Sequence, residues 1–164
     1  MKAADLIREL ELQPHPEGGY FRETYRSSEE TAQASLPARF RGNRSHSTAI
    51  YFLLPQGSKS HLHRIASDEV WHFYLGGPLR IVEIQPDGSA RETTLGQDLA
   101  RGEKLQHVVR AGTWFGAYPA PGTEYSFVGC TVSPGFDFAD FELADREEML
   151  TLFPAAMNAI KSVT

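Results

Sequence analysis

The chain has 164 residues, of which 41% are hydrophobic, so it can bury one apolar core but is short for two domains. Its formal net charge is −5 and its basic residues are scattered, which leaves no positive field for nucleic acid or anionic lipid. We therefore expect a single domain, residues 1–164, that binds neither nucleic acid nor a membrane.

Cysteine content and hydropathy bear on location. The one cysteine, Cys130, cannot form an internal disulfide, and no apolar run is long enough to span a bilayer. The opening MKAADLIREL is a charged amphipathic segment rather than a signal peptide. These features predict a cytoplasmic protein. Cys130 itself lies in the apolar run YSFVGCTV and is predicted to be a small buried hydrophobe.

The first predicted element is a short helix. Leu6, Ile7 and Leu10 recur at helical spacing, which predicts a helix over about residues 3–12, and prolines at 14 and 16 prevent its continuation. The stretch EGGYFRETYRS then alternates aromatic and polar residues in the manner of a strand. Residues 27–47 show no steady period and are predicted to form a long surface loop.

From Ser47 onward the chain is a succession of short strand-like runs separated by Gly/Pro turns. Such spacing predicts an antiparallel sandwich or barrel, over about residues 17–135. The segment ELADREEMLTLFP returns to helical periodicity, with Asp145 as N-cap, and predicts a helix over about 145–153 that Pro154 ends. The predicted fold is mainly β, a barrel or jelly roll with a short helix at each end. The runs are STAIYFLL, SHLHRI, DEVWHFYL, LRIVEIQ, RETTLG, LQHVVRAG, TWFGAYP and EYSFVGCTVS.

The stretch SHLHRIASDEVWHFYLGG, residues 60–77, holds the residues best suited to chemistry. Alternate side chains of a strand share a face, so Glu69, Trp71 and Phe73 should point one way and His72 the other. By the same rule His61 and His63 should share a face. We expect His63 and Glu69 to look into the barrel, where two ligands are too few for a metal site.

The spacing of these residues carries a family resemblance. Gly57, His63, Glu69 and Gly76 are spaced as in the first motif of the cupin superfamily, with Ile65 where a second histidine is expected. Taking His61 and His63 together restores the histidine pair. In the region of the second motif, RAGTWFGAYP, Phe115 stands where the fourth metal ligand would be. The resemblance thus argues against the usual centre of three histidines and one glutamate.

Longer segments resemble one cupin subfamily, domain of unknown function 985, also called cupin type 5. They are PHPEGGYFRETYRS, STAIYFLL, SDEVWHFYLGGPLRI, AGTWFGA and GCTVSPGFDFADFELADREEML. The resemblance implies a double-stranded β-helix jelly roll, a homodimer, and a barrel similar to epimerases of the dTDP-4-dehydrorhamnose 3,5-epimerase type. It implies no particular reaction.

The leading hypothesis is a metal-free isomerase or epimerase of a small polar molecule, sugar-like or anionic. His63 would be the general base, and Glu69 or Asp68 would orient it or carry the complementary proton. The epimerases return a proton from a tyrosine, for which the candidates here are Tyr20, Tyr74 and Tyr118. An aromatic lumen would stack on the ligand, formed by Trp71, Phe73, Trp114 and Phe115.

Two alternatives stay open. In one, the same lumen holds a metabolite without catalysis. In the other, His61 or His63 joins Glu69, with His107 as a further candidate, around a divalent metal ion.

At the N-terminus, the two glycines at 18 and 19 allow a close backbone approach. Next to them, Tyr20 and Arg22 share a face on which Arg22 could bind a carboxylate or phosphate; an edge strand pairing with a second subunit is the other interpretation.

Overall fold

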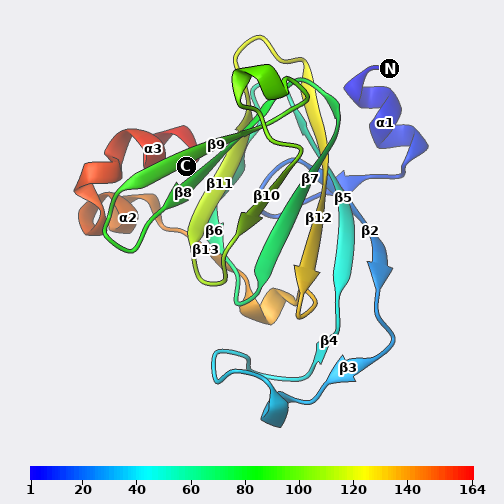
Figure 1. Ribbon diagram of the computed structural model, residues 1–164, viewed down its shortest axis with the longest axis vertical. Helices are drawn as coiled ribbons and strands as arrows, with labels where there is room; N and C mark the ends of the chain where they lie inside the picture. The colour runs from blue at the N-terminus through cyan, green and yellow to red at the C-terminus, as the bar shows by residue number, and fades with distance from the viewer.

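The computed structural model describes residues 1–164 and contains two antiparallel β-sheets that face each other as a jelly roll (Figure 1). The larger sheet has the order β1 (Gln13–Pro14), β2 (Tyr20–Arg26), β5 (Thr48–Pro55), β12 (Tyr125–Ser133), β7 (Asp68–Gly76), β10 (Gln106–Val109). The smaller has the order β13 (Glu142–Leu143), β6 (Ser60–Arg64), β11 (Trp114–Pro119), β8 (Leu79–Ile84), β9 (Ala90–Leu95). A short ribbon of β3 (Glu30–Thr31) and β4 (Arg44–Ser45) extends away from both.

The main core lies between the two sheets. Strands buried on one face alternate inward apolar and outward polar residues, and β7 shows this clearly, with Glu69, Trp71 and Phe73 buried in turn. The predicted facing of these three residues is confirmed. The core between the sheets contains Phe52, Leu54, Trp71, Phe73, Leu79, Ile81, Leu95, Val109, Phe115, Ala117, Val128 and Cys130.

Helices cover the outer faces of the sheets. Helices α2 (Arg146–Leu152) and α3 (Met157–Ser162) lie against the smaller sheet, where Met149 and Ile160 pack on Leu62 and Val82 (Figure 1). Helix α1 (Ala3–Glu9) packs Leu6 against Leu53 on the larger sheet. The remaining helical turns are 3₁₀ in type: η1 (Gln33–Ser35), η2 (Leu99–Arg101), η3 (Phe138–Asp140) and η4 (Pro154–Ala156).

The predicted elements agree with the structure in number and order from β5 to β12, which confirms the mainly β jelly roll with short terminal helices. Asp145 caps α2 as predicted, accepting a hydrogen bond from Glu148 N at 2.9 Å. Three details differ: α1 ends earlier than expected, residues 27–47 contain the β3–β4 ribbon, and α3 follows Pro154. The sequence pattern does not predict helix α3, which is short and is held in place by the tertiary packing of Ile160 rather than by local periodicity.

No helix of this structure has the length and apolar character needed to cross a lipid bilayer.

Candidate acid–base site

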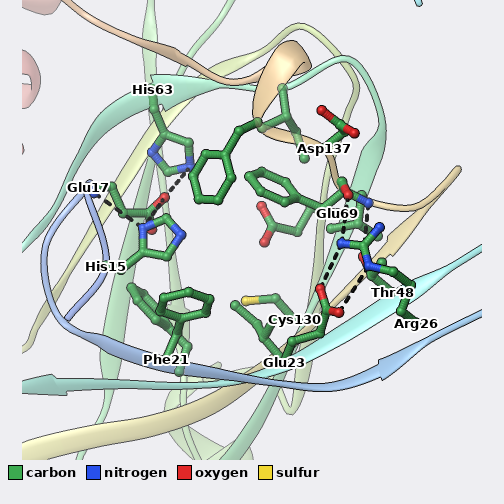
Figure 2. Close-up of a pocket in the computed structure, with 16 residues that line it drawn as sticks. His15, Glu17, Phe21, Glu23, Arg26, Thr48, His63, Glu69, Cys130 and Asp137 are labelled. Carbon is green, nitrogen blue, oxygen red and sulfur yellow. Dashed lines mark hydrogen bonds and ion pairs between the residues drawn. The ribbon is translucent and has the colours of Figure 1, made fainter. Parts of the chain in front are cut away.

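A cavity of about 260 Å³ opens between the two sheets, and it contains most of the ionisable groups of the interior (Figure 2). Its walls come from β2, β5, β6, β7, β12, the loop before β2 and the loop after β12. A volume of this size suits a small metabolite. The polar residues that line it are His15, Glu17, Glu23, Arg26, Thr48, His63, Glu69, Cys130 and Asp137.

Glu17 is placed by a loop that packs tightly on β6. Gly18 follows it with φ +107°, and a Cβ there would lie 2.1 Å from the Lys59 carbonyl oxygen, so only glycine fits. The carbonyl oxygen of Glu17 accepts a hydrogen bond from His61 N at 2.7 Å. The close backbone approach predicted for the glycine pair is thereby confirmed, and it fixes Glu17 beside the strand that carries His63.

A β-bulge in β6 turns two side chains toward Glu17. Ser60 is opposite Ala117 on β11 and His63 is opposite Phe115, so three steps on β6 match two on β11. Ser60 Oγ donates to Glu17 Oε1 at 2.7 Å, and His63 Nε2 lies 3.2 Å from Glu17 Oε2. The prediction that His61 and His63 share a face is wrong, because the bulge sends His61 to the exposed side.

The hydrogen bonds of His63 define where its proton sits. Its Nδ1 is 2.7 Å from the carbonyl oxygen of His61, which can only accept, so Nδ1 carries the hydrogen. The lone pair on Nε2 of the neutral ring then faces the Glu17 carboxyl group, and the contact is favourable only when one proton lies between them. Burial raises the pKa of Glu17 and lowers the pKa of His63, which favours the form in which a neutral Glu17 donates to a neutral His63.

Glu69 faces this pair from the opposite sheet. It lies on β7, while His63 lies on β6, and its carboxyl group extends toward the middle of the cavity (Figure 2). Burial raises the pKa of Glu69 to about 7, and Glu17 raises it further whenever Glu17 is ionised. The Trp71 indole N–H and the Cys130 thiol lie near enough to lower that pKa slightly, yet neither forms a hydrogen bond of ordinary geometry with it, and Trp71 Nε1 has no partner.

His15 is the second imidazole of the cavity. Its Nδ1 accepts a hydrogen bond from Glu17 N at 3.2 Å, which places its hydrogen on Nε2. The ring lies edge-on to Phe21, with centroids 4.6 Å apart, and burial lowers its pKa. His15 is therefore a neutral donor at neutral pH.

The opposite side of the cavity carries an ion pair. Arg26 donates to both carboxylate oxygens of Glu23, at 3.0 and 2.7 Å, and to the Phe136 carbonyl oxygen at 3.0 Å (Figure 2). The exposed carboxylate of Asp137 lies nearby and raises the pKa of Arg26 further, after the larger effect of the Glu23 hydrogen bonds. Both walls of the cavity are thus polar, and phenylalanine rings lie between them.

Comparison with known families places the chain. The sequence model of the cupin superfamily (DUF985) matches residues 4–144, which is most of the protein. The chain is a DUF985 cupin. An uncharacterized protein of Saccharomyces cerevisiae is 32% identical over 154 residues, covering 88% of this chain and 76% of that protein.

Solved structures agree with this assignment. A hypothetical protein from Leishmania major has 36% identity and a TM-score of 0.89, covering 100% of this chain and 99% of that one. A Shewanella oneidensis protein has 40% identity and a TM-score of 0.88, covering 100% and 98%. Oxalate decarboxylase of Bacillus subtilis has 14% identity and a TM-score of 0.55, covering 92% of this chain and 37% of its own; it shows the cupin fold alone.

The aromatic residues predicted to form the lumen of this cupin lie elsewhere. Trp71, Phe73 and Phe115 fill the core beneath the cavity, and the Phe115 ring packs on His63 with centroids 4.2 Å apart. Trp114 points to the outer face of the smaller sheet, where it packs beside the C-terminal helices and under Arg64, because adjacent residues of β11 face opposite ways.

The predicted N-terminal and tyrosine contacts also lie outside the cavity. Arg22 is exposed and donates to the Leu10 carbonyl oxygen at 3.0 Å. Tyr20 packs near α1, Tyr74 lies on the outer face of the larger sheet, and Tyr118 donates to Glu92 at 3.1 Å. These residues alternate with the inward ones along their strands, and sequence alone does not say which set faces inward. Asp68 is half-buried outside the cavity, and its carboxylate accepts hydrogen bonds from Arg110 and Ala111 N.

The residues do not fit the metal centre of cupins. His61 is exposed and outside the cavity, with its Nδ1 2.6 Å from the Glu17 carbonyl oxygen, and His107 lies 2.7 Å from Glu83, also outside the cavity. Phe115 fills the position of a fourth ligand. No three histidine, cysteine, aspartate or glutamate side chains are grouped in a way that could hold a metal ion. We derive no chemistry through a metal from this site.

Sequence reasoning did not single out His15 and Glu17 as site residues. They lie in PHPEGG, with no strand or helix period, and 43 residues separate Glu17 from Ser60. The available signal was an ionisable pair held between prolines and glycines, a setting in which a loop is stiff enough to position side chains.

Proposed function

We propose that this cupin is a metal-independent isomerase or epimerase that moves a proton on a small, sugar-like carbonyl compound. The observation that carries the proposal is the Glu17–His63 pair, whose Oε2 and Nε2 atoms lie 3.2 Å apart and which faces Glu69 across the cavity. Proton-transfer catalysts work best when their pKa lies near the operating pH, and Glu69, at about 7, meets that condition.

The reaction needs two groups with complementary proton states. Glu17 takes the proton from the carbon next to the carbonyl while its own proton moves to His63 Nε2, and His15 Nε2–H donates to the oxygen that gains charge. Protonated Glu69 returns a proton from the opposite sheet, so that no net proton is gained or lost. This scheme keeps His63 and Glu69 in the roles predicted for them and adds Glu17. Glu69 here returns the proton, a role that a tyrosine has in the epimerases that the sequence resembles.

The test is exchange of substrate hydrogen with solvent. A panel of small ketoses and hydroxyketones is incubated with the protein in D₂O, and deuterium at the carbon next to the carbonyl is followed by NMR. Exchange by the wild type should fall by about 100-fold or more in His63→Asn and Glu69→Gln, the usual contribution of an acid–base group. Glu124→Gln, a change of an exposed glutamate, is the matched control.

Two outcomes contradict the proposal. Exchange that persists in both site variants would mean that these groups transfer no proton. Tight binding of a panel member without exchange would support the alternative that the cavity is a binding site without catalysis.

We also propose that the protein works as a cytoplasmic homodimer of single-domain subunits. The support is the outer face of the larger sheet, which α1 covers only in part and which exposes Tyr74, Leu75 and Val108. Light scattering coupled to size exclusion tests the dimer, and a monomeric mass would contradict it.

A further inference from the structure

The side chains that line the cavity carry more negative than positive charge. They include four carboxyl groups and a single guanidinium, together with two imidazoles that burial keeps neutral. The carboxyl groups are Glu17, Glu23, Glu69 and Asp137, and the guanidinium is that of Arg26. A carboxylate or phosphate entering the cavity would therefore need a cation that is free to bind it.

The one cation of the cavity is already paired with a carboxylate. Both carboxylate oxygens of Glu23 and the Phe136 carbonyl oxygen already engage the Arg26 guanidinium. Arg22, which the sequence suggested as the residue that would bind a carboxylate or phosphate, lies outside the cavity. Of the imidazole nitrogens, His63 Nδ1 is bound to a carbonyl oxygen and its Nε2 faces Glu17. An anion would find the neutral His15 Nε2–H and Arg26 Nη1 as donors, but it would be repelled by the carboxylates around it.

Glu69 supplies the independent observation that points to a ligand. It is 8% exposed, its carboxyl group reaches into the cavity, and no protein hydrogen bond of ordinary geometry satisfies it (Figure 2). A buried carboxyl group with an unfilled acceptor is costly unless a partner arrives from the ligand side.

Aromatic rings complete the environment. Four phenylalanines line the cavity, and the rings of Phe136 and Phe138 meet at a right-angled contact with centroids 5.0 Å apart. The faces of aromatic rings are negative and attract organic cations that have been partly desolvated. The four are Phe21, Phe52, Phe136 and Phe138.

We propose that the cavity selects a small molecule with a positively charged nitrogen, which Glu69 and the phenylalanine faces hold, and that it rejects anions. This rests on the proposed function only in taking the cavity as the substrate site. It narrows the substrate class from polar molecules in general to amine-bearing ones.

The experiment compares three probes of one shape and different charge. They are choline, the neutral alcohol in which a tert-butyl group replaces trimethylammonium, and the anion tert-butylacetate. Binding is measured by calorimetry at about pH 8, where Glu69 is ionised. We expect choline to bind about tenfold tighter than the neutral alcohol, a cation–π and charge effect of ordinary size, and the anion not to bind.

Two variants connect the preference to named side chains. Glu69→Gln should reduce the choline preference to the part that the phenylalanine rings supply, while leaving the affinity for the neutral probe unchanged. Glu23→Gln frees the Arg26 guanidinium and should make tert-butylacetate bind. Glu124→Gln should behave as the wild type.

Equal affinity for the three probes, preference for the anion, or no binding of any probe would overturn the inference. Preferential choline binding without hydrogen exchange on any panel compound would support the inference of cation selectivity and contradict the proposed function. Hydrogen exchange on a neutral or anionic compound, together with no binding preference for choline, would support the proposed function and overturn the inference of cation selectivity.

Discussion

At the scale of single residues, the cavity depends on how Glu17 is surrounded. Its two carboxyl oxygens face Ser60 Oγ and His63 Nε2, and its backbone N–H binds His15. Each contact is with a buried polar group, so removing one leaves a partner unsatisfied in a low dielectric. The protonation states of the site follow from this network.

Glu69 should make the stability of the protein depend on pH. Its pKa rises from 4.5 to about 7 on folding, so the neutral form favours the folded state. This contribution is complete below pH 4.5 and is lost as the pH rises through 7. Glu69→Gln should therefore gain roughly 3 kcal/mol over wild type between about pH 4.5 and pH 8. Urea unfolding of both proteins at the two pH values checks this, and a gap independent of pH would contradict it.

Ser60→Ala should destabilise the protein by about 1–2 kcal/mol, because the buried Glu17 carboxyl group loses its hydroxyl donor. The control is Ser133→Ala, which removes a hydroxyl that donates to the His46 carbonyl oxygen from an exposed position and should cost less. Urea unfolding of the two variants separates them. Equal losses of unfolding free energy in the two variants would show that the buried Ser60 hydrogen bond stabilises the folded state no more than the exposed one.

At the scale of elements, two local irregularities build the site. The 15–19 loop fits against β6 only because Gly18 has no Cβ, and the bulge in β6 turns Ser60 and His63 to the same side. A regular strand would place residues three apart on opposite faces. The strand period therefore predicted His63 inward correctly and His61 incorrectly.

Gly18→Ala should cost about 1–3 kcal/mol more than Gly122→Ala. Both glycines have positive φ, +107° and +83°, so both substitutions strain the backbone, but a Cβ at Gly122 has no atom within 4 Å. Only the Gly18 variant must push the loop off β6 and move Glu17. Thermal unfolding measures the difference, and solvent exchange of substrate hydrogen should fall in that variant alone. Equal unfolding temperatures would contradict the tight fit.

At the scale of the whole molecule, a buried ion pair ties distant segments together at the cavity rim. Arg44 on β4 donates to both oxygens of Asp140 in η3, at 2.7 and 2.6 Å, and the two side chains are 4% and 5% exposed. Asp140 lies two residues after the rim residue Phe138. The pair therefore holds the β3–β4 ribbon and the rim in one arrangement.

A double-mutant cycle on Arg44→Ala and Asp140→Ala should show strong coupling. Each single substitution leaves a buried charge without its partner, so the double variant should be about 2 kcal/mol more stable than the sum of the two single losses predicts. The coupling is no larger because the Arg44 guanidinium lies near the surface, where solvent screens the interaction. Urea denaturation of the four proteins gives the coupling. Additive losses would mean that the pair does not link the ribbon to the rim.

The sequence by itself determined the mainly β fold, the order of the strands from β5 to β12, the cap of α2 and the inward facing of Glu69. These depend on local period and on turn and cap chemistry, which act between neighbouring residues. Only the tertiary structure decided that His15 and Glu17 join His63, that Trp114, Tyr20 and Arg22 lie outside the cavity, and that His61 turns away. The positions of His15, Glu17 and His61 depend on a bulge and on a loop packed against a strand 43 residues away, and contacts of that range leave no period in the sequence. The outward positions of Trp114, Tyr20 and Arg22 depend on which face of each strand packs inward, which the alternation alone does not specify.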